Sequence, residues 1–308
     1  MQLRTVISTA LAAAPLAVSA AGTLGFAVGN TNPDGTCKKI SDFEADFEAI
    51  KGNTDAGLVR TYSSTDQFGN ACNTPSEVLP AAKSAGIKVL LGLWPDGGAW
   101  EKEKAALDAA DPSSFGDTLY GITVGSEGMY RGTYNAEELV GWIQETKKDY
   151  PNTKVGTADS WNCWANGTMD SIITSGLDLV LANGFAYWQY QEIGNATKTY
   201  FDDMAQALAH VQDVTGSLDQ IHFMNGETGW PGTGGTDAGA AKAGDDNMES
   251  YWKSAVCGLL DWGVDLFWFE AFDEPNKPAA IGDNGQEADE SHWGSFDAER
   301  NPKFDMRC

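Results

Sequence analysis

The stretch QIHFMNGETGW (220–230) begins as an apolar strand and then places Glu227 among glycines, where a buried strand ends. Seven further runs share its apolar character: LGFAVGN (24–30), GLVRTYS (57–63), KVLLGLWPD (88–96), LYGITVGSE (119–127), KVGTADSW (154–161), LDLVLANGFAYW (177–188) and VDLFWFEAFDE (264–274). Val, Ile and Leu with little polar alternation predict parallel strands buried on both faces. Amphipathic helical segments fall between the runs. Eight such alternations predict an α/β fold, a single (β/α)8 TIM barrel, with an open eight-stranded sheet as the alternative.

Two of the helical segments have clear patterns. Ser41 and Glu44 have capping-box spacing, and apolar residues follow at helical spacing: Phe43, Phe47 and Ile50. A second stripe follows the seventh run, made of Met248, Trp252, Ala255 and Leu259. Both stripes predict helices that pack one face on the barrel.

The first 20 residues, MQLRTVISTALAAAPLAVSA, have the pattern of a secretory signal. Arg4 supplies the positive charge, an apolar run follows, and Val18-Ser19-Ala20 is a plausible cleavage site. A buried N-terminal helix is the alternative. No later run is long enough to span a bilayer and the chain ends without a hydrophobic tail, so we expect no membrane anchor. Residues 21–308 are then expected to form one exported catalytic domain.

The formal net charge of −24 excludes binding to nucleic acid or anionic membranes by charge and suits a neutral partner. The 11 tryptophans and 9 tyrosines fit this, because aromatic faces stack on sugar rings, although core packing also uses them. In an exported protein we expect cysteines to pair, as Cys37–Cys72 and Cys257–Cys308, with Cys163 free. Asn166 and Asn195 begin glycosylation sequons.

Carboxylates stand at the ends of two predicted strands, where barrel enzymes place their active sites. The fourth run ends in Ser126-Glu127-Gly128 and the seventh in Gly226-Glu227-Thr228. Two glutamates from separate strands, among tryptophans and tyrosines, point to glycoside chemistry: one protonates the leaving oxygen and the other attacks the anomeric carbon or activates water. Adjacent glycines would let a substrate approach the backbone. Alternatively, each glutamate caps the following helix or pairs with Arg60, Arg131 or Lys277, and the pattern leaves both readings open.

Other chemistries find little support in the sequence. There is no G-x-S-x-G elbow, no H-E-x-x-H, no P-loop and no complete dinucleotide fingerprint. No CxxC pair or Cys/His cluster supports zinc. We therefore expect neither a metal nor a cofactor, because acetal cleavage needs only carboxylates.

Four ordered segments resemble glycoside hydrolase family seventeen: VGSEGMYR (124–131), ANGFAYWQ (182–189), GETGWP (226–231) and WFEAFDEPNK (268–277). The fungal cell-wall branch, the Bgl-two type of β-1,3-glucanase and glucanosyltransferase, is the most similar. The resemblance implies a TIM barrel and a retaining mechanism, with Glu127 as acid/base and Glu227 as nucleophile. Many relatives carry Asn before the acid/base, where it bonds the sugar 2-hydroxyl. Ser126 is shorter, so that contact is expected to weaken or to pass through water.

Around the two glutamates we expect Tyr187 to hydrogen-bond Glu227 and Trp230 to offer a stacking face. Glu270, Glu274 and Lys277 are expected to form a charged network beside the site, either structural or in contact with substrate. Further substrate-binding candidates, each of which could instead serve packing or a turn, are Tyr62, Asp66, Asn183, Trp188 and Phe272.

The leading hypothesis is an exported enzyme that cleaves β-1,3-glucan and transfers the glycosyl segment to water or to another glucan in the fungal cell wall. Its partner would be glucan, its wall association non-covalent, and it would bind no nucleic acid. The alternative from another class is a non-catalytic glucan-binding wall protein on the same barrel. Retention of both Glu127 and Glu227 favours the enzyme.

Overall fold

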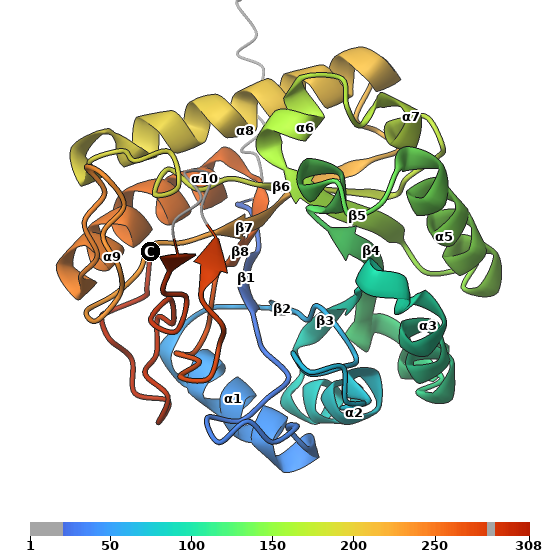
Figure 1. The fold of residues 1–308 in the computed structure, drawn as a ribbon, viewed down its shortest axis with the longest axis horizontal. Helices are drawn as coiled ribbons and strands as arrows, with labels where there is room; N and C mark the ends of the chain where they lie inside the picture. The colour runs from blue at the N-terminus through green and yellow to red at the C-terminus, as the bar shows by residue number, and fades with distance from the viewer. Residues whose placement is uncertain (1–20, 282–286) are drawn as a thin grey trace, which may run out of the picture.

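The computed structural model describes residues 21–281 and 287–308, so the predicted signal at residues 1–20 lies outside the described residues. Eight parallel strands close into a barrel in sequence order, with β1 paired to β8 (Figure 1). The strands are β1 (Leu24–Ala27), β2 (Leu58–Arg60), β3 (Lys88–Leu93), β4 (Leu119–Ser126), β5 (Val155–Ser160), β6 (Leu179–Asn183), β7 (His222–Thr228) and β8 (Asp265–Trp268). Each lies inside its predicted run. The TIM barrel is confirmed, and the open-sheet alternative is wrong.

Helices surround the barrel, as the ring of coils in Figure 1 shows. They are α1 (Ile40–Asn53), α2 (Thr74–Ala85), α3 (Trp100–Ala109), α4 (Gly128–Arg131), α5 (Ala136–Asp149), α6 (Trp161–Ala165), α7 (Asp170–Ile173), α8 (Ile193–Thr215), α9 (Asp245–Tyr251) and α10 (Cys257–Trp262). A π-helical turn, Trp252–Val256, joins α9 to α10. Two short 3-10 turns, Asp96–Gly98 and Pro112–Thr118, flank α3, and β9 (Ala280–Ile281) pairs with β10 (Glu287–Ala288).

Both predicted helical stripes are buried against the barrel. Phe43, Phe47 and Ile50 of α1 are buried, as are Met248, Trp252, Ala255 and Leu259. The predicted capping box is displaced, however. Helix α1 starts two residues earlier than a Ser41 cap implies, and the Lys39 N–H donates to Asp42 Oδ2 over 2.8 Å. The side-chain contact at the start of the helix therefore joins Lys39 and Asp42 rather than Ser41 and Glu44, and it runs in one direction only, because a lysine side chain cannot accept a hydrogen bond.

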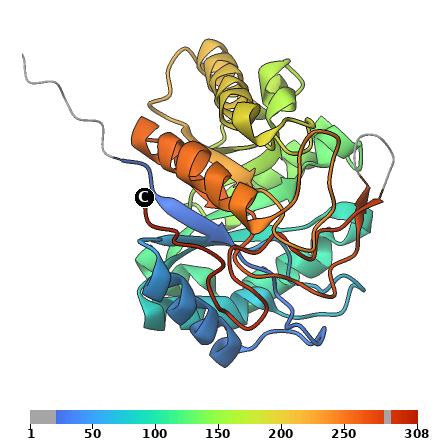
Figure 2. The ribbon, with the colours of Figure 1, turned by 90° about the vertical axis from the view of Figure 1, so that its left-hand side faces the viewer.

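Two disulfides fasten the chain, and both match the predicted pairing. Cys37–Cys72 links the segment after β1 to the segment after β2, and Cys163 is free and buried. Cys257–Cys308 ties the C-terminal segment to α10. The N-terminal strand is held at the same place, because the Gly22 N–H donates to Leu260 O of α10 over 2.8 Å. Figure 2 shows β1 and the C-terminal end beside each other next to this helix.

No helix in the described part of the chain is long and apolar enough to cross a membrane.

Candidate active site

Glu127 directly follows β4 and lies in the cleft at the carboxyl ends of the strands. Its backbone is left-handed, with φ 57° and ψ 20°. Two side chains hold its carboxylate: Asn183 Nδ2 donates to Oε1 over 3.0 Å and Arg131 Nη1 pairs with Oε2 over 3.1 Å. The Glu127 side chain keeps 22% of its surface exposed, and Arg131 keeps 39%. The acid/base candidate is thus held by one buried and one partly exposed partner.

Glu227 lies within β7 and is held from β2. Arg60 Nη1 pairs with Glu227 Oε1 over 3.0 Å and also donates to Gly226 O over 2.7 Å. Arg60 Nη2 donates to Ser126 Oγ over 3.1 Å, and Ser126 Oγ lies 3.3 Å from Glu227 Oε1. One guanidinium therefore holds the carboxylate, the strand beneath it and the serine before Glu127.

Burial is the largest influence on Glu227 and raises its pKa to about 7; Arg60 opposes this shift, and the negative charge of Glu127 adds to it. The Tyr62 hydroxyl faces Glu227 and also favours its charged form. This hydroxyl is not aligned as a regular hydrogen bond, so we treat the contact as electrostatic. Burial also raises the pKa of Tyr62 well above its ordinary value, which keeps the phenol neutral.

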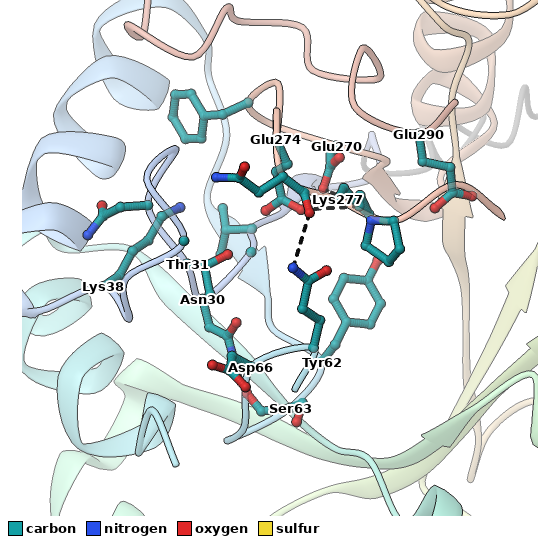
Figure 3. A pocket seen from close by; sticks show the side chains of 18 of the residues that line it. Asn30, Thr31, Lys38, Tyr62, Ser63, Asp66, Glu270, Glu274, Lys277 and Glu290 are labelled. Atoms are coloured by element: carbon teal, nitrogen blue, oxygen red, sulfur yellow. Dashed lines mark hydrogen bonds and ion pairs between the residues drawn. The ribbon is translucent and has the colours of Figure 1, made fainter. Parts of the chain in front are cut away.

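Both glutamates line one cleft of about 470 Å3, bounded mainly by the segments after β1, β2 and β8. Its volume falls in the range of ordinary ligand pockets. Figure 3 shows Glu270, Glu274 and Lys277, from the segment after β8, opposite Ser63 and Asp66, from the segment after β2. Aromatic side chains supply apolar faces in this lining: Tyr62, Phe68, Trp94, Phe269 and Phe272.

The predicted charged network beside the site is present. Lys277 Nζ lies 2.8 Å from Glu270 Oε2 and 3.3 Å from Glu274 Oε2, and it sits 4.2 Å from the centre of the Phe269 ring. Burial raises the pKa of Glu270 well above its usual range, and the Glu274 charge adds to this. All three charged residues line the cleft, so they combine an ion-pair role with access to a ligand.

Two aromatic predictions are wrong. Tyr187 does not bond Glu227: its hydroxyl donates to the Thr236 carbonyl, and its ring packs on Trp230 and Trp293. Trp230 offers no stacking face, because it is fully buried and its Nε1 donates to Lys242 O over 2.8 Å. Trp188 stacks on Trp293 at 5.6 Å and stands outside the described lining of the cleft. These rings pack on one another and on Trp293 rather than lining the cleft.

The other candidates divide by their contacts. Asp66 lines the cleft but accepts the N–H groups of Phe68 and Asn70, so it forms a turn. Phe272 lines the cleft and packs on Phe296. Asn183 and Ser126 bond the glutamates themselves, as described above. Tyr62 both lines the cleft and faces Glu227.

The glycines beside the glutamates make room for protein atoms rather than for a substrate. A Cβ at Gly226 would collide with Asn183 Oδ1, and one at Gly229 with the Phe269 carbonyl. A Cβ at Gly128 would collide with the Tyr134 ring. These glycines therefore allow Asn183, Phe269 and Tyr134 to pack closely against the strand ends.

Sequence reasoning considered Arg60 and Arg131 only as structural partners, and it gave no role to Asp159 or Glu290. The signal available in the sequence was an arginine within an apolar strand. The structure shows that the Arg60 side chain is buried there, with 1% of its surface exposed. Asp159, at the end of β5, accepts backbone N–H groups behind Glu127. Glu290 lines the cleft near Lys277 and Glu127. In the described ranges, no group of three or more His, Cys, Asp or Glu residues could hold a metal ion.

Comparisons with known proteins show the family to which the chain belongs. Residues 25–294 match the family described as the BtgE/BtgC glycoside hydrolase domain. A glucan 1,3-beta-glucosidase of Arthroderma benhamiae is 49% identical over 100% of this chain and 98% of its own. A glucan 1,3-beta-glucosidase of Saccharomyces cerevisiae is 39% identical over 98% of this chain and 96% of its own. The crystal structure of a family 17 beta-1,3-glucanosyltransferase from Rhizomucor miehei has a TM-score of 0.76 and 26% identity, covering 93% of this chain and 98% of that one. The chain therefore belongs to the BtgE/BtgC glycoside hydrolases of family seventeen and is a glycosidase.

Proposed function

We propose that the chain is a retaining β-1,3-glucan-active enzyme in which Glu227 is the nucleophile and Glu127 the acid/base. The observation that carries the proposal is that two glutamates from β4 and β7, each held by an arginine, line one cleft with aromatic faces. Relatives named glucan 1,3-beta-glucosidase and a related glucanosyltransferase in complex with laminaritriose support the substrate class.

In the first step Glu227 attacks the anomeric carbon while Glu127 protonates the departing sugar oxygen. This step leaves a covalent glycosyl-enzyme. Arg60 keeps a population of Glu227 ionised against the effect of burial, and the neutral Tyr62 hydroxyl faces the same carboxylate. In the second step Glu127 takes a proton from the acceptor, whose oxygen attacks the anomeric carbon and releases Glu227.

The acceptor decides the product. Water gives hydrolysis, and a sugar hydroxyl gives a glucan with a new linkage. Similarity to proteins named both glucosidase and glucanosyltransferase supports a site that uses both acceptors. We further propose that the protein is exported and associates non-covalently with the cell wall, on the basis of the signal pattern at residues 1–20.

The test uses a short defined β-1,3-glucan oligomer as sole substrate, with product size, linkage and anomeric configuration followed by mass spectrometry and NMR. Products that first appear as the β-anomer are expected, and products longer than the donor would establish transfer. Initial α-anomer would overturn the retaining mechanism. Equal inertness of the wild type and Glu227→Gln, with glucan binding intact, would instead support the binding protein.

A further inference from the structure

The helix behind the acid/base candidate begins in an unusual way. Glu127 occupies the N-cap position of α4, and the cap residue's side chain normally accepts the N–H groups of the first turn. Here it makes no such bond. The carboxylate is directed instead to Asn183 and Arg131. The first-turn N–H groups of α4 therefore need another acceptor.

Asp159, at the end of the neighbouring strand β5, is that acceptor. Its Oδ2 accepts the Met129 N–H over 3.1 Å and its Oδ1 accepts the Tyr130 N–H over 3.2 Å. The strands are joined at this point, because the Glu127 N–H donates to Ala158 O over 3.0 Å. One carboxylate from β5 thus caps a helix whose own cap residue faces the cleft.

The surroundings of Asp159 fit this task. It is fully buried, it also accepts the Ser160 N–H over 2.8 Å, and it shares a hydrogen bond with the Cys163 thiol. Burial raises the pKa of Asp159 to about 6, and the nearby Glu127 charge adds to this. Such a buried carboxylate is costly unless its oxygens are well bonded, so these N–H groups stabilise it while it fixes them.

We propose that Asp159 is a positioning residue for Glu127: by capping α4 in its place, it leaves the Glu127 carboxylate free to protonate the leaving oxygen. The inference rests on the proposed role of Glu127 as acid/base. Without Asp159, two N–H groups lose their acceptor and Glu127, in the N-cap position, turns back toward them. The rate is then reduced at the step that needs proton donation by Glu127, whereas substrate binding and attack by Glu227 are little affected.

The experiment compares two leaving groups in Asp159→Asn. A β-1,3-gluco-oligosaccharide needs protonation of its leaving sugar, whereas the 2,4-dinitrophenyl β-glycoside of laminaribiose does not. The first-turnover rate is measured for each, so that the second step does not interfere. General acid catalysis supplies about 10²–10⁴-fold. We expect about a 10–100-fold loss of the first-turnover rate constant with the oligosaccharide, half-saturation at a nearly unchanged substrate concentration, and less than about a threefold loss in the rate of the dinitrophenolate burst.

Asp178→Asn is the matched control. Asp178 accepts the Val155 N–H over 2.9 Å at the opposite end of β5, so its loss perturbs the same strand away from the cleft. It should affect both substrates alike and only slightly. Equal losses on both substrates in Asp159→Asn, or no loss on either, would overturn the inference.

Two further variants keep the outcomes separate. Glu127→Gln should show the same leaving-group dependence more strongly. If it does not, the acid/base assignment fails; if it does and Asp159→Asn does not, only the present inference fails. Should the melting temperature show that Asp159→Asn folds poorly, Asp159→Glu is used instead: it retains a carboxylate, so any loss of its first-turnover rate should still be larger with the oligosaccharide than with the dinitrophenyl glycoside. Failure of Asp159→Glu to show this difference would count against positioning by the carboxylate.

Discussion

The two glutamates share a residue type and a cleft, but their surroundings differ. Glu227 pairs with Arg60, whose side chain is 1% exposed, and the same guanidinium also binds Gly226 and Ser126. Glu127 pairs with Arg131, which is 39% exposed, and relies on Asn183 and on a backbone fixed by Asp159. A buried cation fixes one carboxylate, whereas the other is held by a partly exposed cation and a neutral amide.

This difference suits the two proposed roles. A nucleophile has to be ionised and immobile at the moment of attack, and a buried guanidinium provides both. An acid/base has to gain and lose a proton, and a neutral amide partner strongly opposes neither the protonated nor the ionised form of the carboxyl group. Substitutions of Glu227, Arg60 and Arg131 test whether this contrast is real.

Replacement of the nucleophile should have the largest effect. Glu227→Gln removes the attacking oxygen while it keeps the shape of the side chain, so kcat should fall by about 10⁵-fold or more for every substrate, whatever its leaving group. Steady-state rates with the oligomer and with the dinitrophenyl glycoside would show this. A variant that still turned over the activated substrate well would exclude Glu227 as nucleophile.

Arg60→Lys should have the next largest effect. A single ammonium cannot bind Glu227, Gly226 O and Ser126 together, so the geometry of the nucleophile should loosen and kcat/KM fall by about 10–100-fold. Because Arg60 lowers the pKa of Glu227, weakening it should raise that pKa. The acidic limb of the kcat/KM profile should then move to higher pH. An unmoved limb would show that this arginine does not control the ionisation of Glu227.

The equivalent change at the partner of Glu127, Arg131→Lys, should lower kcat/KM only a few-fold. Arg131 is partly exposed, its charge is screened by solvent, and Asn183 still binds Glu127. Melting temperature and kcat/KM measured beside Arg60→Lys make the comparison direct. A loss as large as that of Arg60→Lys would remove the contrast between the two glutamates.

The sequence predicted the fold well because its signal is continuous. A barrel strand is buried on both faces, so it appears as an uninterrupted apolar run, and all eight barrel strands lie inside the predicted runs. The helix start at Ile40, with Lys39 as N-cap, was missed because two acidic residues, Asp42 and Glu44, stood at plausible distances. Only the backbone decides which of them accepts the N–H of the N-cap residue.

The site was predicted less evenly. Carboxylates at strand ends are visible in a sequence, and so is the Glu-rich segment with Lys277. The direction of a ring is not, which is why Tyr187 and Trp230 were assigned to the cleft although both face the interior. The roles of Arg60 and Asp159 depend on contacts between β2 and β7 and between β5 and α4. Spacing along the chain carries no signal of such contacts.

The smallest expected effect concerns the pH dependence of folding stability, which can be measured separately from the pH dependence of catalysis. Burial raises the pKa of Asp203 in α8 to about 7, as it does that of Glu227. A carboxyl with a raised folded-state pKa binds its proton more tightly in the folded chain, so stability is greatest below the unfolded pKa and declines as pH rises toward about 7. The melting temperature should therefore be higher at pH 5 than at pH 7.5.

Asp203→Asn should flatten this decline by roughly 2–4 °C without altering the pH profile of activity. Its exposed neighbour Asp202, whose side chain is 60% accessible, offers an Asp202→Asn control. Because the Asp202 charge is a lesser cause of the raised pKa of Asp203 than burial, this variant should weaken the decline only slightly. If the decline survives Asp203→Asn undiminished, the buried groups of the cleft itself dominate the pH dependence of stability.

The attachment of both ends of the barrel to one helical unit has a consequence for how long the folded protein lasts. Gly22 bonds α10, Cys308 is disulfide-linked to it, and the Met306 carbonyl accepts Trp252 Nε1 over 3.1 Å. The first and last strands are also paired with each other. The C-terminal segment cannot leave without breaking a covalent bond, and the N-terminal strand cannot leave without opening the seam of the barrel. Contacts of this kind are expected to slow unfolding as well as to shift its equilibrium, and resistance to loss of the folded state is then set by a rate.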